Sequence, residues 1–179
     1  GKIGWVSTKI MLGFGCEVIG YDKYPSETFL ALGARYTEPG EIGAKADIIS
    51  LHCPLTPETH HIVNADTLSR AKRGALLVNT SRGGLVDTEA AIEALKSGQL
   101  GGLALDVYEQ EADLFFRDLS STIIADDVFQ RLLSFPNVIV TGHQAFFTQE
   151  AITTICETTI NSVTQFANGQ PLTDEIKIA

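Results

Sequence analysis

The chain has 179 residues, enough for one domain with a substantial core, and its content of 44% hydrophobic and 20% charged residues is ordinary for a globular protein. A formal net charge of −9 without a visible basic patch argues against nucleic acid as a partner. No apolar run approaches the roughly 20 residues of a membrane span, so we expect no membrane partner either.

The three cysteines, Cys16, Cys53 and Cys156, are widely spaced and lie in apolar surroundings. Their odd number and the lack of a C-x-x-C pattern argue against disulfides and zinc ligands. We expect reduced thiols in the core of the protein, and therefore a cytoplasmic, reducing setting.

The first 22 residues match the second half of a dinucleotide-binding pattern. Gly1 and Gly4 fit the last two glycines of G-x-G-x-x-G, a helix is expected over 4–12, and a strand over 16–21 leads into Asp22. A glycine pair in an ordinary turn is the alternative, and an acid at this distance after a strand argues against it. The carboxylate would accept hydrogen bonds from the adenosine ribose and repel a 2′-phosphate, which favours NAD over NADP.

Strands and helices alternate along the rest of the chain. The expected strands cover 34–36, 47–53, 75–78, 101–107 and 137–141, and the expected helices cover 25–32, 41–46, 64–71, 89–97, 128–133 and 148–167. An irregular insert is expected over 112–127. This order predicts an α/β fold with a doubly wound parallel sheet.

Charged side chains follow three of the expected strands: Arg82, the acids Asp106 and Glu111, and His143. The carboxyl ends of parallel strands face one crevice, so these groups can meet there. An arginine can hold a substrate carboxylate with two hydrogen bonds, and a histidine can exchange a proton with a substrate oxygen. A carboxylate orients the imidazole. Beside a nicotinamide, this set predicts hydride transfer to or from a 2-oxo or 2-hydroxy acid.

Each of these residues taken alone also has an ordinary structural explanation. Arg82 could be a surface or helix-capping residue, His143 a loop residue, and Glu109 with Glu111 a solvated acidic turn. Their occurrence together at successive strand ends favours the functional interpretation. The remaining histidines, His52, His60 and His61, are expected to be polar strand-end and loop residues, and no Cys/His spacing here suits a metal, so we expect no metal site.

Four segments resemble the D-isomer-specific 2-hydroxyacid dehydrogenases over essentially the whole chain: His52–Thr56, Asn79–Gly83, Asp106–Glu111 and Thr141–Phe146. The insert around Asp113–Phe116 and Asp126–Phe129 is similar to the D-lactate dehydrogenase branch of that family. The resemblance implies a Rossmann-type fold, NAD as the cofactor, a small 2-oxo or 2-hydroxy acid such as pyruvate or D-lactate as the substrate, and a homodimer.

The resemblance also implies roles for residues that match the family's motifs. Arg82 would bind the substrate carboxylate, His143 would be the acid/base, and Glu111 would be its carboxylate partner. The cofactor-binding residues would be Gly1, Lys2, Ile3, Gly4, Asp22, Cys53, Pro54, Asn79, Thr80, Ser81, Asp106 and His143.

The chain departs from the family at its N-terminus, where most of the substrate domain and the first strand of the nucleotide domain have no counterpart. We interpret residues 1–146 as an incomplete NAD-binding domain and 147–179 as a helical segment that returns to the substrate domain. The missing strand would leave the strands at 16–21 and 75–78 without the neighbour expected to bridge them, so the fragment is expected neither to fold stably nor to turn over alone. The competing interpretations are a dinucleotide-sensing, corepressor-like binding protein and a truncated pseudoenzyme on the same scaffold.

Overall fold

A computed structural model of the chain describes residues 1–115, 118 and 121–175. It contains two compact units, Gly1–His143 and Gln144–Ala179. The first unit holds all of the described strands, and the second is built around one long helix.

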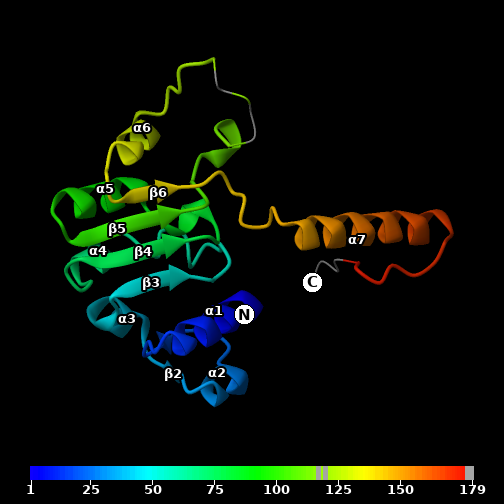
Figure 1. Cartoon of the computed structure of the whole chain (residues 1–179), viewed down its shortest axis with the longest axis horizontal. Helices are drawn as coiled ribbons and strands as arrows, with labels where there is room; N and C mark the ends of the chain where they lie inside the picture. Colours follow the sequence, from blue (N-terminus) through cyan, green and yellow to red (C-terminus); the bar gives the residue numbers. More distant parts are fainter. Residues whose placement is uncertain (116–117, 119–120, 176–179) are drawn as a thin grey trace. The chain divides into compact units, whose positions relative to one another are not determined.

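Two parallel sheets form the framework of the first unit (Figure 1). The larger sheet has the order β3-β4-β5-β6, and its strands are β3 (Ile48–Leu51), β4 (Ala75–Asn79), β5 (Leu100–Leu105) and β6 (Val138–Val140). The smaller sheet pairs β1 (Ile19–Gly20) with β2 (Arg35–Tyr36). The parallel α/β architecture expected from the sequence is confirmed.

The two sheets correct one expectation about strand neighbours. β4 lies between β3 and β5 and is hydrogen-bonded on both sides, so the prediction that residues 75–78 lack a bridging neighbour is wrong. Within the described residues, β1 and β2 in the smaller sheet and β3 and β6 in the larger sheet are each paired on one side only. Each later crossover adds its strand farther out, which leaves β3 innermost in the larger sheet.

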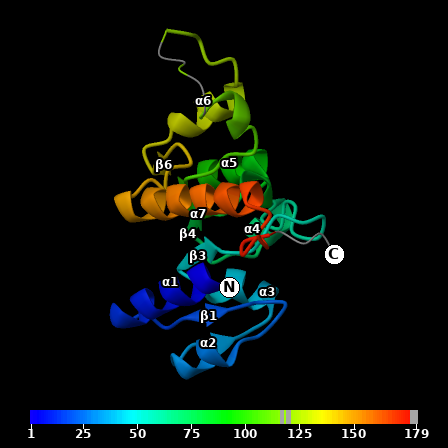
Figure 2. The same ribbon diagram turned by 90° about the vertical axis from the view of Figure 1, so that its right-hand side faces the viewer.

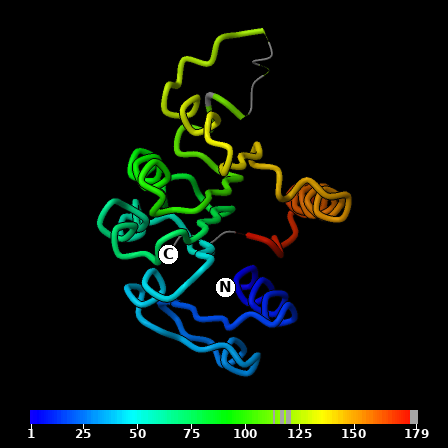
Figure 3. The backbone as a smooth tube through the Cα atoms, turned by 60° about the vertical axis from the view of Figure 1, so that its left-hand side comes forward, coloured from blue at the N-terminus to red at the C-terminus, as the bar shows by residue number. Residues whose placement is uncertain are grey.

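Helix α1 precedes β1, and each of α2 to α6 lies between two successive strands along the chain, whose path Figure 3 traces by colour. They are α1 (Lys2–Gly13), α2 (Glu27–Ala31), α3 (Pro39–Lys45), α4 (Ala65–Ser69), α5 (Thr88–Lys96) and α6 (Asp127–Leu133), with short 3-10 turns η1 (Gly83–Leu85) and η2 (Glu111–Asp113). In Figure 2, α1 and α2 lie together with β1 in the blue, N-terminal part of the unit. Each expected helix is present, with ends that differ by a few residues.

Side-chain caps define where several helices begin. Asn64 forms a capping box with Thr67 at the start of α4. Asp87 accepts a hydrogen bond from the Ala90 amide at 3.0 Å, and Asp126 accepts one from the Phe129 amide at 2.8 Å. These side chains satisfy amides that have no partner inside the helix, a contribution of about 1 kcal/mol each.

The main core lies between one face of the larger sheet and helices α4, α5 and α6. Leu77 and Leu103 pack there against Leu68, Leu95 and Leu132 from the three helices. The opposite face of the sheet carries the apolar side chains of Ile48, Leu76 and Ile139, which are exposed within this unit. Successive strand residues point to opposite faces, so each strand divides its apolar residues between these two surfaces.

The cysteines overturn a second expectation. All three are free thiols, but Cys16 and Cys156 are exposed and Cys53 is only half-buried. Cys16 follows the end of α1, and Cys156 lies on a helix that has no buried residue within its unit. An apolar sequence neighbourhood therefore did not indicate burial here.

The second unit contains α7 (Gln149–Ala167), which begins where Thr148 accepts a hydrogen bond from the Ala151 amide at 3.2 Å. The apolar residues Ile160, Val163 and Phe166 of this helix are exposed. None of the helices in the described part of the chain has both the length and the apolar character that crossing a membrane requires.

Replacing Gly101 by alanine should destabilise the protein. Gly101 is the extra residue of a register shift between β4 and β5, and an added Cβ would lie 2.3 Å from the carbonyl oxygen of Gly74. Because this contact is with backbone, we expect the free energy of unfolding to fall by about 1–3 kcal/mol, measured by urea denaturation of the full-length protein. The control is Gly40→Ala in α3, where a Cβ meets nothing within 4 Å, and an unchanged midpoint for Gly101→Ala would contradict the prediction.

Candidate active site

The carboxyl ends of the four strands of the larger sheet lie in register: Leu51 pairs with Asn79, Asn79 with Leu105, and Leu105 with Val140. Chain segments that are far apart in the sequence therefore leave the sheet at one edge. Hydrogen bonds continue across this edge beyond the strands, because the Asp106 amide donates to the Asn79 carbonyl at 2.9 Å and the His143 amide donates to the Asp106 carbonyl at 2.7 Å.

Asn79 organises the loop that follows β4. Its side chain has 0% exposure; its oxygen accepts from the Ser81 amide at 3.0 Å, and its amide nitrogen donates to the Arg82 carbonyl at 2.8 Å. The Ser81 hydroxyl donates to the Cys53 carbonyl at 2.7 Å, which ties this loop to the end of β3. The buried Asn79 side chain therefore fixes the backbone of this loop. Thr80 and Arg82, in contrast, are exposed.

Arg82 leaves this loop in an extended backbone conformation, directly before η1. Its Nη1 donates to the Ser81 carbonyl at 2.7 Å, which steadies the exposed guanidinium. The next residue, Gly83, lies so close to the segment after β5 that a Cβ would be 2.1 Å from the Tyr108 carbonyl carbon. Only glycine permits this approach, so the loop after β4 rests directly on the loop after β5.

Glu111 and His143 form a close pair at the same edge. His143 Nδ1 lies 2.8 Å from Glu111 Oε1, and the Tyr108 amide donates to Glu111 Oε2 at 2.9 Å. Glu111 is thus held by the backbone while it orients the imidazole. Because an ionised carboxylate can only accept, Nδ1 carries the hydrogen of this bond, and in the neutral ring Nε2 is then the nitrogen with the basic lone pair.

Asp106 is buried directly behind this pair, with 5% exposure. The Thr141 hydroxyl donates to its Oδ1, and its own backbone bonds join β4 to the His143 loop. His143 has a positive φ of 48°, a conformation that non-glycine residues adopt only where the surrounding structure imposes it. The imidazole is therefore positioned by its backbone as well as by Glu111.

A second cluster of expected residues lies at the N-terminus of α1. An added Cβ on Gly4 would be 3.5 Å from the His52 Cβ, so the first turn of α1 approaches the end of β3, and Gly1, Lys2 and Ile3 are exposed. The Gly1 nitrogen lies 3.2 Å from Asp22 Oδ2. A helix N-terminus with exposed amides is suited to bind phosphate groups.

Asp22 borders a small cavity next to this helix end. The cavity has a volume of about 210 Å³ and is lined by Tyr21, Asp22, Pro25, Tyr36, Thr37 and Glu38. The Tyr24 amide donates to Asp22 Oδ1 at 2.9 Å, and this bond lowers the pKa of the Asp22 carboxyl. The side chain is therefore a carboxylate at neutral pH and is available as a hydrogen-bond acceptor.

The loop after β3 lies between these two clusters. Burial lowers the pKa of His52 and raises the pKa of the Cys53 thiol, so both side chains are uncharged at neutral pH. His52 Nε2 lies 3.0 Å from the Ser50 hydroxyl, and Pro54 is exposed, with its carbonyl accepting from the Thr59 hydroxyl at 2.7 Å. The side chains of His52, Cys53 and Pro54 in the loop after β3 thus carry no charge at neutral pH.

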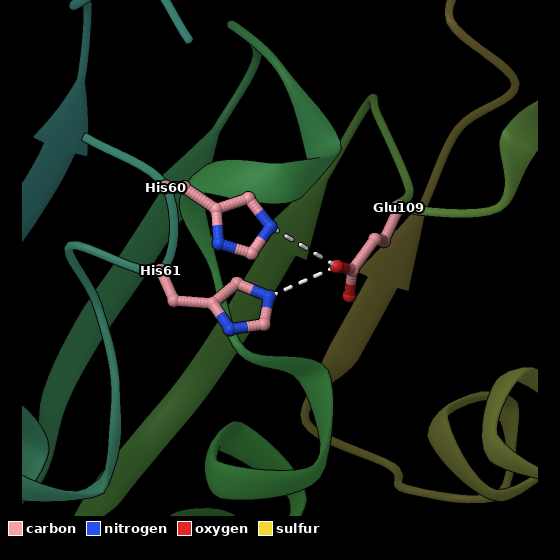
Figure 4. A group of neighbouring side chains, drawn as sticks. All are labelled: His60, His61 and Glu109. Carbon is pink, nitrogen blue, oxygen red and sulfur yellow. Dashed lines mark hydrogen bonds and ion pairs between the residues drawn. The ribbon is translucent and has the colours of Figure 1, made fainter. Parts of the chain in front are cut away.

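The structure also brings together residues that we had interpreted separately from the sequence. The Glu109 carboxylate faces His60 and His61, whose rings stack at 3.9 Å between centroids (Figure 4). Glu109 lies 48 residues after His61, so no local spacing indicates the contact. The only indication of this contact in the sequence was the expected strand order, because His60–His61 and Glu109 both follow strands of the same sheet.

Comparisons with known proteins agree with this geometry. The family described as D-isomer specific 2-hydroxyacid dehydrogenase, NAD binding domain, matches residues 1–145. The chain is 55% identical over 166 residues to 2-hydroxyacid dehydrogenase A of Aspergillus oryzae, a match that covers 93% of this chain and 48% of that protein. It therefore spans about half the length of the curated relatives that it matches.

Solved structures show the same relationship. The crystal structure of a D-lactate dehydrogenase from Treponema pallidum superposes with a TM-score of 0.94 at 35% identity, over 99% of this chain and 54% of that one. The pyruvate reductase of Chlamydomonas reinhardtii gives a TM-score of 0.93 at 42% identity, over 97% of this chain and 53% of that one. The chain belongs to the D-isomer specific 2-hydroxyacid dehydrogenase family, and its residues 1–145 match the model of that family's NAD-binding domain.

Proposed function

We propose that the full-length protein is an NAD-dependent D-2-hydroxyacid dehydrogenase that interconverts pyruvate and D-lactate. The observation that carries this proposal is the Glu111–His143 pair, at 2.8 Å, on the same sheet edge as an exposed arginine. The names of the two similar solved structures, a D-lactate dehydrogenase and a pyruvate reductase, support pyruvate as the substrate.

In this proposal, His143 is the acid/base. Its Nε2 gives a proton to the oxygen on C2 of the 2-oxo acid during reduction and takes it back during oxidation. The bound cofactor would supply the hydride for C2 as NADH and accept it in the reverse direction as NAD⁺. Glu111 acts through His143, because it holds Nδ1 and stabilises the positive charge that the ring carries when it is protonated.

Arg82 binds the substrate carboxylate. The guanidinium presents several N–H groups in one plane, which matches the two oxygens of a carboxylate. Gly83 and Asn79 position the arginine: Gly83 allows its loop to rest on the segment that holds Glu111, and Asn79 holds the Arg82 carbonyl. The substrate is thereby bound at one end and protonated at the other.

The residues at the other cluster fit NAD. The exposed first turn of α1, from Gly1 to Gly4, would receive the pyrophosphate, and the Asp22 carboxylate would accept from the adenosine ribose beside the 210 Å³ cavity. The cleft from there to His143 would be lined by Cys53, Pro54, Thr80, Ser81 and Asp106, with Asn79 supporting it from inside.

The proposal includes the setting of the protein. Three free cysteines, two of them exposed, suit the reducing cytoplasm, where such thiols are not oxidised to disulfides. We further propose that the full-length enzyme is a homodimer, which a measurement of its mass in solution would test.

The direct test is NADH oxidation by the full-length protein with a panel of 2-oxo acids, followed by NAD reduction with D- and L-lactate. We expect pyruvate and D-lactate to be the preferred pair. Tight NADH binding without turnover of any 2-oxo acid would contradict the enzyme proposal and favour a dinucleotide-sensing protein.

Changing Arg82 to glutamine should weaken substrate binding specifically. Loss of a charge-assisted, two-point contact should lower kcat/KM for pyruvate by about 100-fold or more, with an unchanged Kd for NADH. The matched control is Arg70→Gln at the C-cap of α4, where the exposed arginine pairs with Asp66. If the affinity for NADH falls as much as kcat/KM, Arg82 does not have this role.

Changing His143 to glutamine should remove proton transfer and lower kcat by about 10²–10⁴-fold. Glu111→Gln should lower kcat as well, and the double variant should be no slower than His143→Gln, because Glu111 acts only through His143. Steady-state kinetics of the three variants test this, with Glu93→Gln on the surface of α5 as the control for loss of a carboxylate. Additive losses in the double variant would show that Glu111 acts independently of His143.

Changing Asp22 to alanine should relax the preference for NAD. The carboxylate, whose lowered pKa keeps it charged at neutral pH, would no longer repel the 2′-phosphate of NADPH. We expect the ratio of kcat/KM for NADPH to that for NADH to rise by about 10-fold or more, a change of 1.4 kcal/mol or more. Asp66→Ala, at an exposed site on α4, serves as the control, and an unchanged ratio in Asp22→Ala would argue against ribose binding at this residue.

A further inference from the structure

We propose that His60, His61 and Glu109 form a binding site for a divalent transition-metal ion, with Zn²⁺ as the best fit. This site is separate from the Glu111–His143 pair and uses residues to which the proposed dehydrogenase reaction gives no task.

The donor atoms already converge. His61 Nε2 lies 2.9 Å and His60 Nε2 lies 3.7 Å from the same oxygen, Glu109 Oε1. One ligand atom from each of the three residues lies within 4.8 Å of the others. Figure 4 shows both imidazole rings turned toward the Glu109 carboxylate. A tetrahedral zinc with bonds of about 2.0–2.1 Å needs donor atoms about 3.3–3.4 Å apart. The two imidazole rings stack with an interplanar angle of 24°, so at least one ring must rotate about its side-chain torsions before both Nε2 lone pairs point at one ion.

The donor set selects the class of metal. Imidazole nitrogens suit zinc, copper and nickel, whereas magnesium and calcium prefer sites made of oxygen ligands. Two histidines and one glutamate also make the three-residue set of open zinc sites, in which water or another ligand takes the fourth position. The side chains of His60, His61 and Glu109 are 52%, 32% and 35% exposed, so an ion can reach them from solvent.

The backbone holds both histidines in place. The His60 amide donates to the Thr56 carbonyl at 2.9 Å, and the His61 amide donates to the Gly84 carbonyl at 2.8 Å. The Asn64 side chain donates to the His61 carbonyl at 2.9 Å. His61 has a positive φ of 50°, so its conformation is imposed by these contacts. Ligands on a preformed backbone lose little conformational freedom on binding.

The third ligand, Glu109, lies in the segment after β5, which Gly83 approaches closely. Glu109 follows Tyr108, and the Tyr108–Glu109 backbone is the segment on which Gly83 rests. A metal ion would therefore cross-link the loop that carries His60 and His61 to the segment after β5. We expect this cross-link to stabilise the folded protein, since an ion that binds only the folded state raises its stability.

The test uses the full-length protein and the metal ion alone. Titration with Co²⁺ should produce the visible absorption of a low-symmetry cobalt site at one equivalent, and Zn²⁺ should displace it. His60→Gln should weaken binding of both ions by about 10-fold or more, and Glu109→Gln should do the same. Glu58→Gln, which removes an exposed carboxylate two residues from His60, should bind as the wild type does.

His60→Gln is the decisive variant because His60 makes the longer, 3.7 Å contact and is the most exposed of the three, so its loss should leave the fold intact. Circular dichroism checks that fold, and Zn²⁺ should raise the Tm of the wild type and of Glu58→Gln more than that of His60→Gln. Equal affinity of wild type and His60→Gln for Zn²⁺, or no saturable binding by the wild type, would overturn the proposal and leave the cluster as a hydrogen-bonded group only.

Discussion

The alignment of four parallel strand ends is the constraint on which the rest of this structure depends. Leu51, Asn79, Leu105 and Val140 lie in one register, so every loop that follows them begins at the same edge. Asn79 extends this order beyond the sheet, because its buried side chain satisfies two backbone groups of the next loop. A buried amide of this kind must have its partners, since an unsatisfied one would cost about 1–3 kcal/mol.

This edge separates two acidic residues of one short segment into different environments. Glu111 turns back to the Tyr108 amide and to His143, whereas Glu109 faces His60 and His61. The segment can do this because Gly83 lets the neighbouring loop approach it closely. We infer that Glu111 serves the proposed proton-transfer site and that Glu109 serves the proposed metal site, although the two residues are only two positions apart.

Much of the fold follows from local patterns. The alternation of apolar strands and capped helices predicts a parallel α/β sheet, and caps such as Asn64 and Asp87 place helix starts to within a residue or two. Burial was harder to predict. Cys16 and Cys156 have apolar sequence neighbours but are exposed, because the local sequence does not show which surface another element covers. The prediction about the strand neighbours of residues 75–78 was also wrong, since pairing depends on the order of the whole sheet.

The sequence by itself determined the chemical groups at the strand ends: Arg82, Glu111 and His143 follow strands in an order that a parallel sheet brings to one crevice. Only the tertiary structure decided which groups touch. It brought Glu109 to His61 across 48 positions, and it set the 2.8 Å distance between Glu111 and His143, a pair that the sequence had indicated only through the family resemblance. The physical reason is that side-chain contacts of a few ångströms depend on how loops pack, and loop packing is set by long-range contacts that no local spacing contains.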